Sequence, residues 1–208
     1  MVAEPLIEFD TTDGAHDYYV NGVLQPSVTQ VLKVGFPFDE DYGGQEISED
    51  VLDNARDRGV VIHEVANLHA LGTLDYESVE EEIAPYLDAL MAWEAEKEVT
   101  FWKTEQLCFN PSPGYCGTVD AVVMRLERAT VVDYKTGSSG VKPWHKYQIA
   151  AYAATQKVGD TWPDGLILQL KSNGKFKEHR YPASEMEWNF KVFEACHTLW
   201  LAKAMDSK

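Results

Sequence analysis

Residues 117–135 read GTVDAVVMRLERATVVDYK, which is two apolar runs separated by the polar pair Glu127-Arg128. Runs rich in valine and bounded by turn residues are typical of buried β-strands. We therefore expect two neighbouring strands joined by a short turn, with Asp120 on the first strand and Asp133 near the end of the second. A sheet built on this pair decides the fold class.

Two carboxylates approach each other if these strands pair as a hairpin, because Asp120 then comes opposite Asp133. Side chains two apart share one face of a strand, so Asp133 and Lys135 point one way and Tyr134 points the other. Adjacent carboxylates repel each other unless a proton or a cation intervenes, and their oxygens suit Mg²⁺ or Mn²⁺. The pattern predicts a divalent-metal site, with Lys135 placed to hold the attacking water or to neutralise charge on a phosphate.

A helix is expected after the second strand, over residues 145–157 (HKYQIAAYAATQK). Gln148 and Tyr152 are four apart and share one face of it, from which they can position a water, the lysine or a scissile strand. Each pattern alone has a structural explanation, such as a surface ion pair for Asp-x-Lys. Their order along the chain makes the set more specific than its parts.

The ordered set Gly117-x-x-Asp120, Asp133-x-Lys135 and Gln148-x-x-x-Tyr152 resembles the PD-(D/E)XK nuclease superfamily, in its RecB-type and phage exonuclease-like branch. That branch also places a histidine shortly after a glycine on an upstream helix, and Arg58-Gly59-Val60-Val61-Ile62-His63 matches this pattern. The motifs cover residues 55–157. Residues 18–32 carry a weaker likeness to the N-terminal segment of phage members.

The resemblance implies an α/β fold with a restriction-endonuclease-like core, in which helices flank a central mixed β-sheet. The reaction that it implies is hydrolysis of DNA phosphodiester bonds with Mg²⁺ or Mn²⁺ as cofactor. The metal ligands that it implies are His63, Asp120, Asp133 and the backbone carbonyl of Tyr134. The catalytic residues that it implies are Asp120, Asp133, Lys135, Gln148 and Tyr152, with Glu105 as a further acid at the same cleft.

We expect one nuclease domain over residues 1–208. Residues 1–46 are predicted to form an arm, with a β-hairpin that turns at Asn21-Gly22 and a short helix capped by Ser27. Residues 47–208 are predicted to form the nuclease core. The further elements predicted there are a helix from Ser48 to Gly72, a helix over 77–98 that starts or kinks at Pro85, a strand over 99–109, a hairpin around 172–174 and a helix over 184–205.

The composition, with 45% hydrophobic residues, is that of a globular protein, but the net charge is −16. The acid is concentrated in residues 38–98, which hold 18 acidic and 3 basic residues, whereas residues 137–182 hold 7 basic and 3 acidic. A polarised molecule of this kind can bind a polyanion on one face. The simpler explanation for the acidic block is a solvated helical surface.

The basic half contains the residues that we expect at a DNA surface. Lys142, Trp144, His145 and Lys146 lie at the start of the predicted helix, where helix N-termini attract phosphates. Trp144 either stacks on an unpaired base or packs in the core. Further candidates are Lys171, Lys175, Lys177 and Arg180, for which the simpler explanation is a solvated surface. The expected partners are DNA, as single strands or ends, and proteins of replication or recombination.

The sequence also bears on cellular context. Residues 1–10 lack the charged and apolar regions of a secretory signal, and no apolar run approaches the roughly 18 residues of a membrane helix. Three scattered cysteines argue against disulfides and against a four-cysteine iron–sulfur cluster. We expect no membrane contact, no iron–sulfur cluster and a cytoplasmic location, which is the host cytoplasm if a phage encodes the chain.

The favoured hypothesis is a metal-dependent DNA nuclease, of exonuclease type, that acts in replication, recombination or repair in a phage or prokaryotic setting. One alternative is a nuclease-like module with weak or lost catalysis that binds DNA or assembles a complex. Another is a metal-dependent phosphohydrolase that acts on nucleotides. The polarity, the strand preference, the number of metal ions and the oligomeric state stay open.

Overall fold

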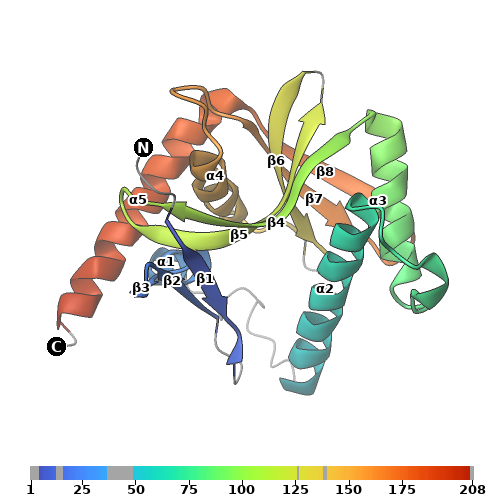
Figure 1. Cartoon of the computed structure of the whole chain (residues 1–208), viewed down its shortest axis with the longest axis horizontal. Helices are drawn as coiled ribbons and strands as arrows, with labels where there is room; N and C mark the ends of the chain where they lie inside the picture. Colours follow the sequence, from blue (N-terminus) through green and yellow to red (C-terminus); the bar gives the residue numbers. More distant parts are fainter. Residues whose placement is uncertain (1–4, 13–15, 37–48, 126, 138–139, 207–208) are drawn as a thin grey trace.

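The protein is described by a computed structural model, which covers residues 5–12, 16–36, 49–125, 127–137 and 140–206. Five strands form a central sheet in the order β4-β5-β6-β7-β8 (Figure 1). Neighbours are antiparallel except for β6 and β7, which are parallel and are joined through helix α4 (His145–Thr155). The strands are β4 (Thr100–Asn110), β5 (Tyr115–Arg125), β6 (Arg128–Lys135), β7 (Asp164–Leu170) and β8 (Phe176–Tyr181). The expected α/β architecture with a mixed sheet is confirmed.

Helices cover both faces of this sheet. Helices α1 (Val28–Gly35), α4 and α5 (Ala183–Asp206) pack on one face around Val119, Val122 and Val131. Helices α2 (Glu49–Ala70) and α3 (Ala84–Lys97) pack on the other around Ala121, Val123 and Val132. Coverage of both faces explains why β5 and β6 read as continuous apolar runs instead of alternating ones.

The segment between α2 and α3 confirms one of the two alternatives predicted at Pro85, a helix that starts there. The helix predicted over 77–98 begins only at Ala84, because Pro85 lies in its first turn, where a missing N–H leaves no hydrogen bond unmade. A single 3-10 turn, η3 (Tyr76–Ser78), precedes it. Gly72 lies just beyond α2 with φ +69°, as expected for a glycine that ends a helix.

The N-terminal arm is a three-stranded antiparallel sheet of β1 (Ile7–Asp10), β2 (Asp17–Val20) and β3 (Val23–Gln25). The predicted hairpin is its β2–β3 half, and Asn21 and Gly22 both have the positive φ of a type I′ turn. Ser27 caps α1 as predicted, in a capping box with Gln30. Strand β1 was not predicted. The predicted start of the long helix at Ser48 and the boundary between residues 46 and 47 lie outside the described residues.

The central sheet forks between β5 and β6. Their pairing ends at Ala121 opposite Val132, whereas the pairing of β6 with β7 continues to Lys135 opposite Gln169. Beyond the fork, β5 stays paired with β4. In Figure 1 the small N-terminal sheet and α2 lie on the same side of the bent β4–β5 pair. The fork therefore leaves the residues around Asp120 free to face a space between these two elements.

Within the described residues, no helix combines the length and the apolar content needed to cross a bilayer. Cys108, Cys116 and Cys196 are buried free thiols.

Candidate metal centre

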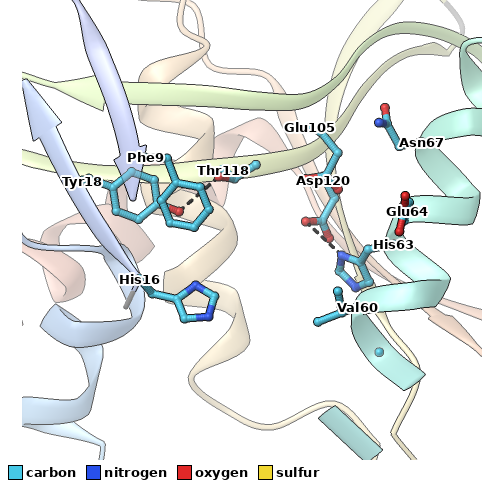
Figure 2. Close-up of a pocket in the computed structure, with 11 residues that line it drawn as sticks. Phe9, His16, Tyr18, Val60, His63, Glu64, Asn67, Glu105, Thr118 and Asp120 are labelled. Carbon is cyan, nitrogen blue, oxygen red and sulfur yellow. Dashed lines mark hydrogen bonds and ion pairs between the residues drawn. The ribbon is translucent and has the colours of Figure 1, made fainter. Parts of the chain in front are cut away.

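Three side chains from three elements meet beside the fork. His63 comes from α2, Glu105 from β4 and Asp120 from β5, and one ligand atom of each lies within 4.8 Å of the others (Figure 2). An imidazole nitrogen and two carboxylate oxygens form a donor set that could hold a divalent metal ion. The structure thus brings together His63, Asp120 and the further acid Glu105.

The alternation of side chains along β4 and β5 explains why Glu105 and Asp120 face α2. Leu107 and Phe109 on β4, with Cys116 on β5, pack against the N-terminal sheet. Side chains two apart share a face, so Glu105 and Asp120 continue these two rows toward α2. The alternation breaks at this point, because Ala121, which follows Asp120, also packs with α2 and α3.

Glu105 sits on a strained backbone. Its φ is +43° in the middle of β4, a left-handed conformation that costs energy for a residue with a side chain. Burial and the nearby charge of Asp120 raise the pKa of Glu105 to about 7. Strain and a perturbed carboxyl in one residue are typical of functional sites.

His63 and Asp120 form an ion pair, with Nδ1 3.4 Å from Oδ1. Burial opposes the charge on the imidazole, but the Asp120 carboxylate outweighs it and raises the pKa of His63 to about 9. Burial likewise opposes ionisation of Asp120, yet His63 and then Lys135 hold the pKa of Asp120 below its usual range. Tyr134 packs its ring edge-on to that of His63, with centroids 5.7 Å apart.

Asp133 and Lys135 lie next to this cluster. Lys135 Nζ lies 2.5 Å from Asp133 Oδ2 as an ion pair, although outside hydrogen-bond geometry. Asp133 is only 3% exposed, and burial together with Asp120 raises its pKa despite the lysine. The charges of both residues act on His63. Asp133 itself is outside the three-residue donor set, so its role as a ligand stays a prediction, as does that of the Tyr134 carbonyl.

Gln148 and Tyr152 both lie on α4, the helix predicted to carry them, and both are buried. Gln148 Oε1 has no hydrogen-bond partner, which is costly for a buried polar atom. A Cβ at Gly117 would lie 2.7 Å from the Tyr152 ring, so the glycine of Gly-x-x-Asp gives the tyrosine its space. Burial raises the pKa of Tyr152, and the charges of Asp133 and Asp120 add to the effect.

The donor set opens into a pocket of about 580 Å³. Its walls come from α2 and from the N-terminal sheet (Figure 2). Sequence reasoning did not identify the remaining lining residues Phe9, His16, Tyr18, Gly59, Val60, Glu64, Asn67 and Thr118. Helical spacing from His63 could have found Val60 and Asn67, which lie three and four residues away on the same face.

The four residues expected at a DNA surface are outside the described lining of this pocket. His145 is buried, its Nδ1 accepts a hydrogen bond from the Lys142 backbone N–H at 3.1 Å, and burial lowers its pKa to about 3. Trp144 is partly buried against the core under α4, and Lys146 Nζ lies over the Tyr147 ring. Of the two roles considered for Trp144, packing against the core is the one observed. Contact of the four residues with DNA stays a prediction.

A second pocket, of about 710 Å³, adjoins the end of β6. Thr136 and Gly137, which follow Lys135, line it together with the cationic residues Arg58, Lys171 and Lys177. Arg58 Nε is buried without a hydrogen-bond partner. This pocket places positive charge beside the lysine of the candidate site.

No protein-family model matches the chain, and no curated protein is similar to it. Among solved structures, one described as "Crystal structure of SSO0001" is similar with 13% identity and a TM-score of 0.32. The similarity covers 81% of this chain and 83% of the other. A likeness at this level supports no conclusion about function.

Proposed function

We propose that this chain is a metal-dependent deoxyribonuclease of the PD-(D/E)XK type, acting as an exonuclease on DNA. The observation that carries the proposal is the meeting of His63, Glu105 and Asp120 within 4.8 Å, beside the Asp133–Lys135 ion pair. These five groups come from α2, β4, β5 and β6. The first and last of them, His63 and Lys135, lie far apart in the sequence. Perturbed titratable groups gathered beside a pocket favour a catalytic site over a surface ion-pair network.

The residues fit a hard divalent cation. His63, Glu105 and Asp120 would hold it, with Asp133 as a further ligand. Glu105 and Asp120 repel each other when both are ionised, and a dication at this point removes the repulsion. When bound, Mg²⁺ or Mn²⁺ would polarise a phosphate oxygen and lower the pKa of a bound water.

Lys135 is the residue that we propose acts on the attacking water. Its ammonium group is held by Asp133 at 2.5 Å and its side chain keeps 23% exposure, so it is fixed and still accessible. It can donate a hydrogen bond to the water or to a phosphate oxygen as charge develops. The free Oε1 of buried Gln148 can accept a hydrogen bond from that water or from the lysine.

Positive charge beside the site supports a polyanionic substrate. Arg58, Lys171 and Lys177 line the second pocket next to Thr136. Cations placed this way bind backbone phosphates without reading sequence. Their position beside Lys135 is compatible with a nucleic-acid strand that passes from one pocket to the other.

The test is digestion of end-labelled single- and double-stranded DNA, linear and circular, with Mg²⁺, Mn²⁺ or a chelator. We expect metal-dependent degradation of linear DNA, release of nucleotides from an end and resistance of circles. Binding of DNA with no cleavage in either metal would overturn the catalytic proposal in favour of a DNA-binding module. Hydrolysis of free nucleotides alone would overturn it in favour of a phosphohydrolase.

A further inference from the structure

The 580 Å³ pocket has two chemically different walls. One carries the donor set of His63, Glu105 and Asp120. The other carries three rings, Phe9 and Tyr18 of the N-terminal sheet and His16 just before β2, which we call the aromatic wall. Figure 2 shows these rings across the pocket from His63 and Asp120. A ligand that fills the space therefore meets charged groups on one side and aromatic faces on the other.

The aromatic wall is built into the small sheet. Phe9 on β1 lies opposite Tyr18 on β2, and their rings stack with centroids 4.6 Å apart and an interplanar angle of 20°. The next pair along this face, Ile7 and Val20, packs onto β4 and β5. The same face of the sheet thus runs from a buried apolar end to an aromatic end that borders the pocket.

A hydrogen bond ties the wall to the strand of the donor set. Tyr18 is 7% exposed, and its hydroxyl is 3.1 Å from Thr118 Oγ1. Thr118 lies two residues before Asp120 on β5 and therefore on the same face of the strand. Phe9 stays 36% exposed on top of the fixed tyrosine. Its accessible ring is thus held in place before any ligand binds, which lowers the entropy cost of binding.

We propose that Phe9 stacks on an unpaired base of the nucleotide whose phosphate lies at the donor set, so that the site selects single-stranded DNA or a frayed end. This inference rests on the proposed nuclease function and deepens it. Every base has an aromatic face, so stacking is tolerant of sequence and suits a nuclease without sequence preference. A base within a duplex is covered by its neighbours and cannot offer that face. His16, exposed at the edge of the wall, adds a second ring 5.7 Å from Phe9.

The size of the pocket agrees with one nucleotide as occupant. Its volume of about 580 Å³ falls within the range of pockets that enclose a small ligand. A purely structural role for Phe9 would predict that the residue is buried like Tyr18, which is 7% exposed, whereas Phe9 is 36% exposed. Binding and stability measurements can separate the two roles.

The test uses fluorescence of a single-stranded oligonucleotide with 2-aminopurine at the terminal positions, in Mn²⁺, with Lys135→Ala as background to stop cleavage. We expect quenching on binding, and Phe9→Ala and Phe9→Leu should weaken binding about 5- to 150-fold, the range for loss of one base stack. Phe9→Trp should retain affinity. Trp188→Ala removes a ring that is 69% exposed on α5 and should change nothing. An oligonucleotide lacking the terminal bases should bind the Phe9 variants and their parent equally.

The outcomes separate this inference from the function on which it rests. If the wild-type chain neither binds nor cleaves DNA in Mn²⁺, the proposed nuclease function fails. If it cleaves DNA and both Phe9→Ala and Phe9→Leu bind the oligonucleotide as tightly as their parent, only the stacking inference is overturned. Thermal unfolding of each variant shows whether it is folded. If Phe9→Ala does not fold, the binding test relies on Phe9→Leu, which keeps an apolar side chain at this position.

Discussion

Asp120 Oδ2 accepts a hydrogen bond from the Tyr134 backbone N–H at 2.7 Å, where the ladder between β5 and β6 has already ended. The side-chain carboxylate thereby takes the place of the next backbone hydrogen-bond acceptor on β5. Its other oxygen faces His63 at 3.4 Å. Asp120 thus holds β5 and β6 together at the fork with one oxygen and supplies negative charge to the donor set with the other. A substitution that keeps the first interaction and removes the charge separates these two roles.

We expect Asp120→Asn to separate them. The amide oxygen can still accept from the Tyr134 N–H, so the variant should fold, with a lower melting temperature because the charged partner of His63 is gone. Loss of the charge should lower the pKa of His63 from about 9 by at least about one unit, since Asp120 is what raises it. NMR titration of the imidazole measures this value. An unchanged His63 titration in a folded variant would contradict the pairing.

Metal affinity should rise with pH. A cation must displace the protons of Glu105, whose pKa is raised to about 7, and of His63, whose pKa is raised to about 9. We expect Mn²⁺ to bind at least about tenfold more tightly at pH 8 than at pH 6, with proton release. Calorimetry in two buffers of different ionisation enthalpy measures both quantities. Affinity that does not vary over this range would exclude these two residues as ligands.

The raised pKa values of His63 and Glu105 also determine how the stability of the metal-free protein varies with pH. The pKa of His63 is raised above its ordinary 6.5, so its contribution is complete below that pH and is lost as pH rises through about 9. Glu105, whose pKa is also raised, destabilises the fold progressively above 4.5. Urea unfolding should therefore show lower stability at pH 9 than at pH 6, and His63→Gln should flatten the difference between pH 6.5 and 9.

Gly117→Ala should cost stability because of Tyr152. The added Cβ would meet the buried ring at 2.7 Å, and overpacking of this kind costs about 1–3 kcal/mol. The cost should fall in a Tyr152→Ala background, where the ring is gone. A double-mutant cycle from urea unfolding measures the coupling. Equal costs in both backgrounds would show that Tyr152 does not set the requirement for glycine.

Much of the fold could be predicted because its signals are local. The valine runs around Asp120 and Asp133, the Asn21-Gly22 turn and the spacing of Gln148 and Tyr152 act within a few residues. Strand β1 escaped prediction because it has four residues, of which only Ile7 and Phe9 are apolar. Missing it hid the aromatic wall, since Phe9 and Tyr18 meet only once β1 pairs with β2.

The composition of the donor set could be predicted only in part. The register that puts Asp120 opposite Asp133 follows from the pairing of Ala121 with Val132, but the strands separate at that point. Asp133 is instead buried with Lys135, while Glu105 joins His63 and Asp120. Glu105 continues the row of Leu107 and Phe109 on β4, but its positive φ is not signalled by the residue type at that position.

The proposed nuclease chemistry depends most on Lys135, and cleavage of end-labelled linear DNA in Mn²⁺ by the wild-type chain and by Lys135→Ala tests it most directly. Lys135→Met, which keeps the aliphatic stem beside Asp133, is the matched second variant should the alanine disturb the fold. We expect metal-dependent cleavage by the wild-type chain and a loss of at least about 100-fold in both variants, with Mn²⁺ binding retained. Cleavage at the wild-type rate by a folded variant, or no cleavage by the wild-type chain, would contradict the proposed chemistry.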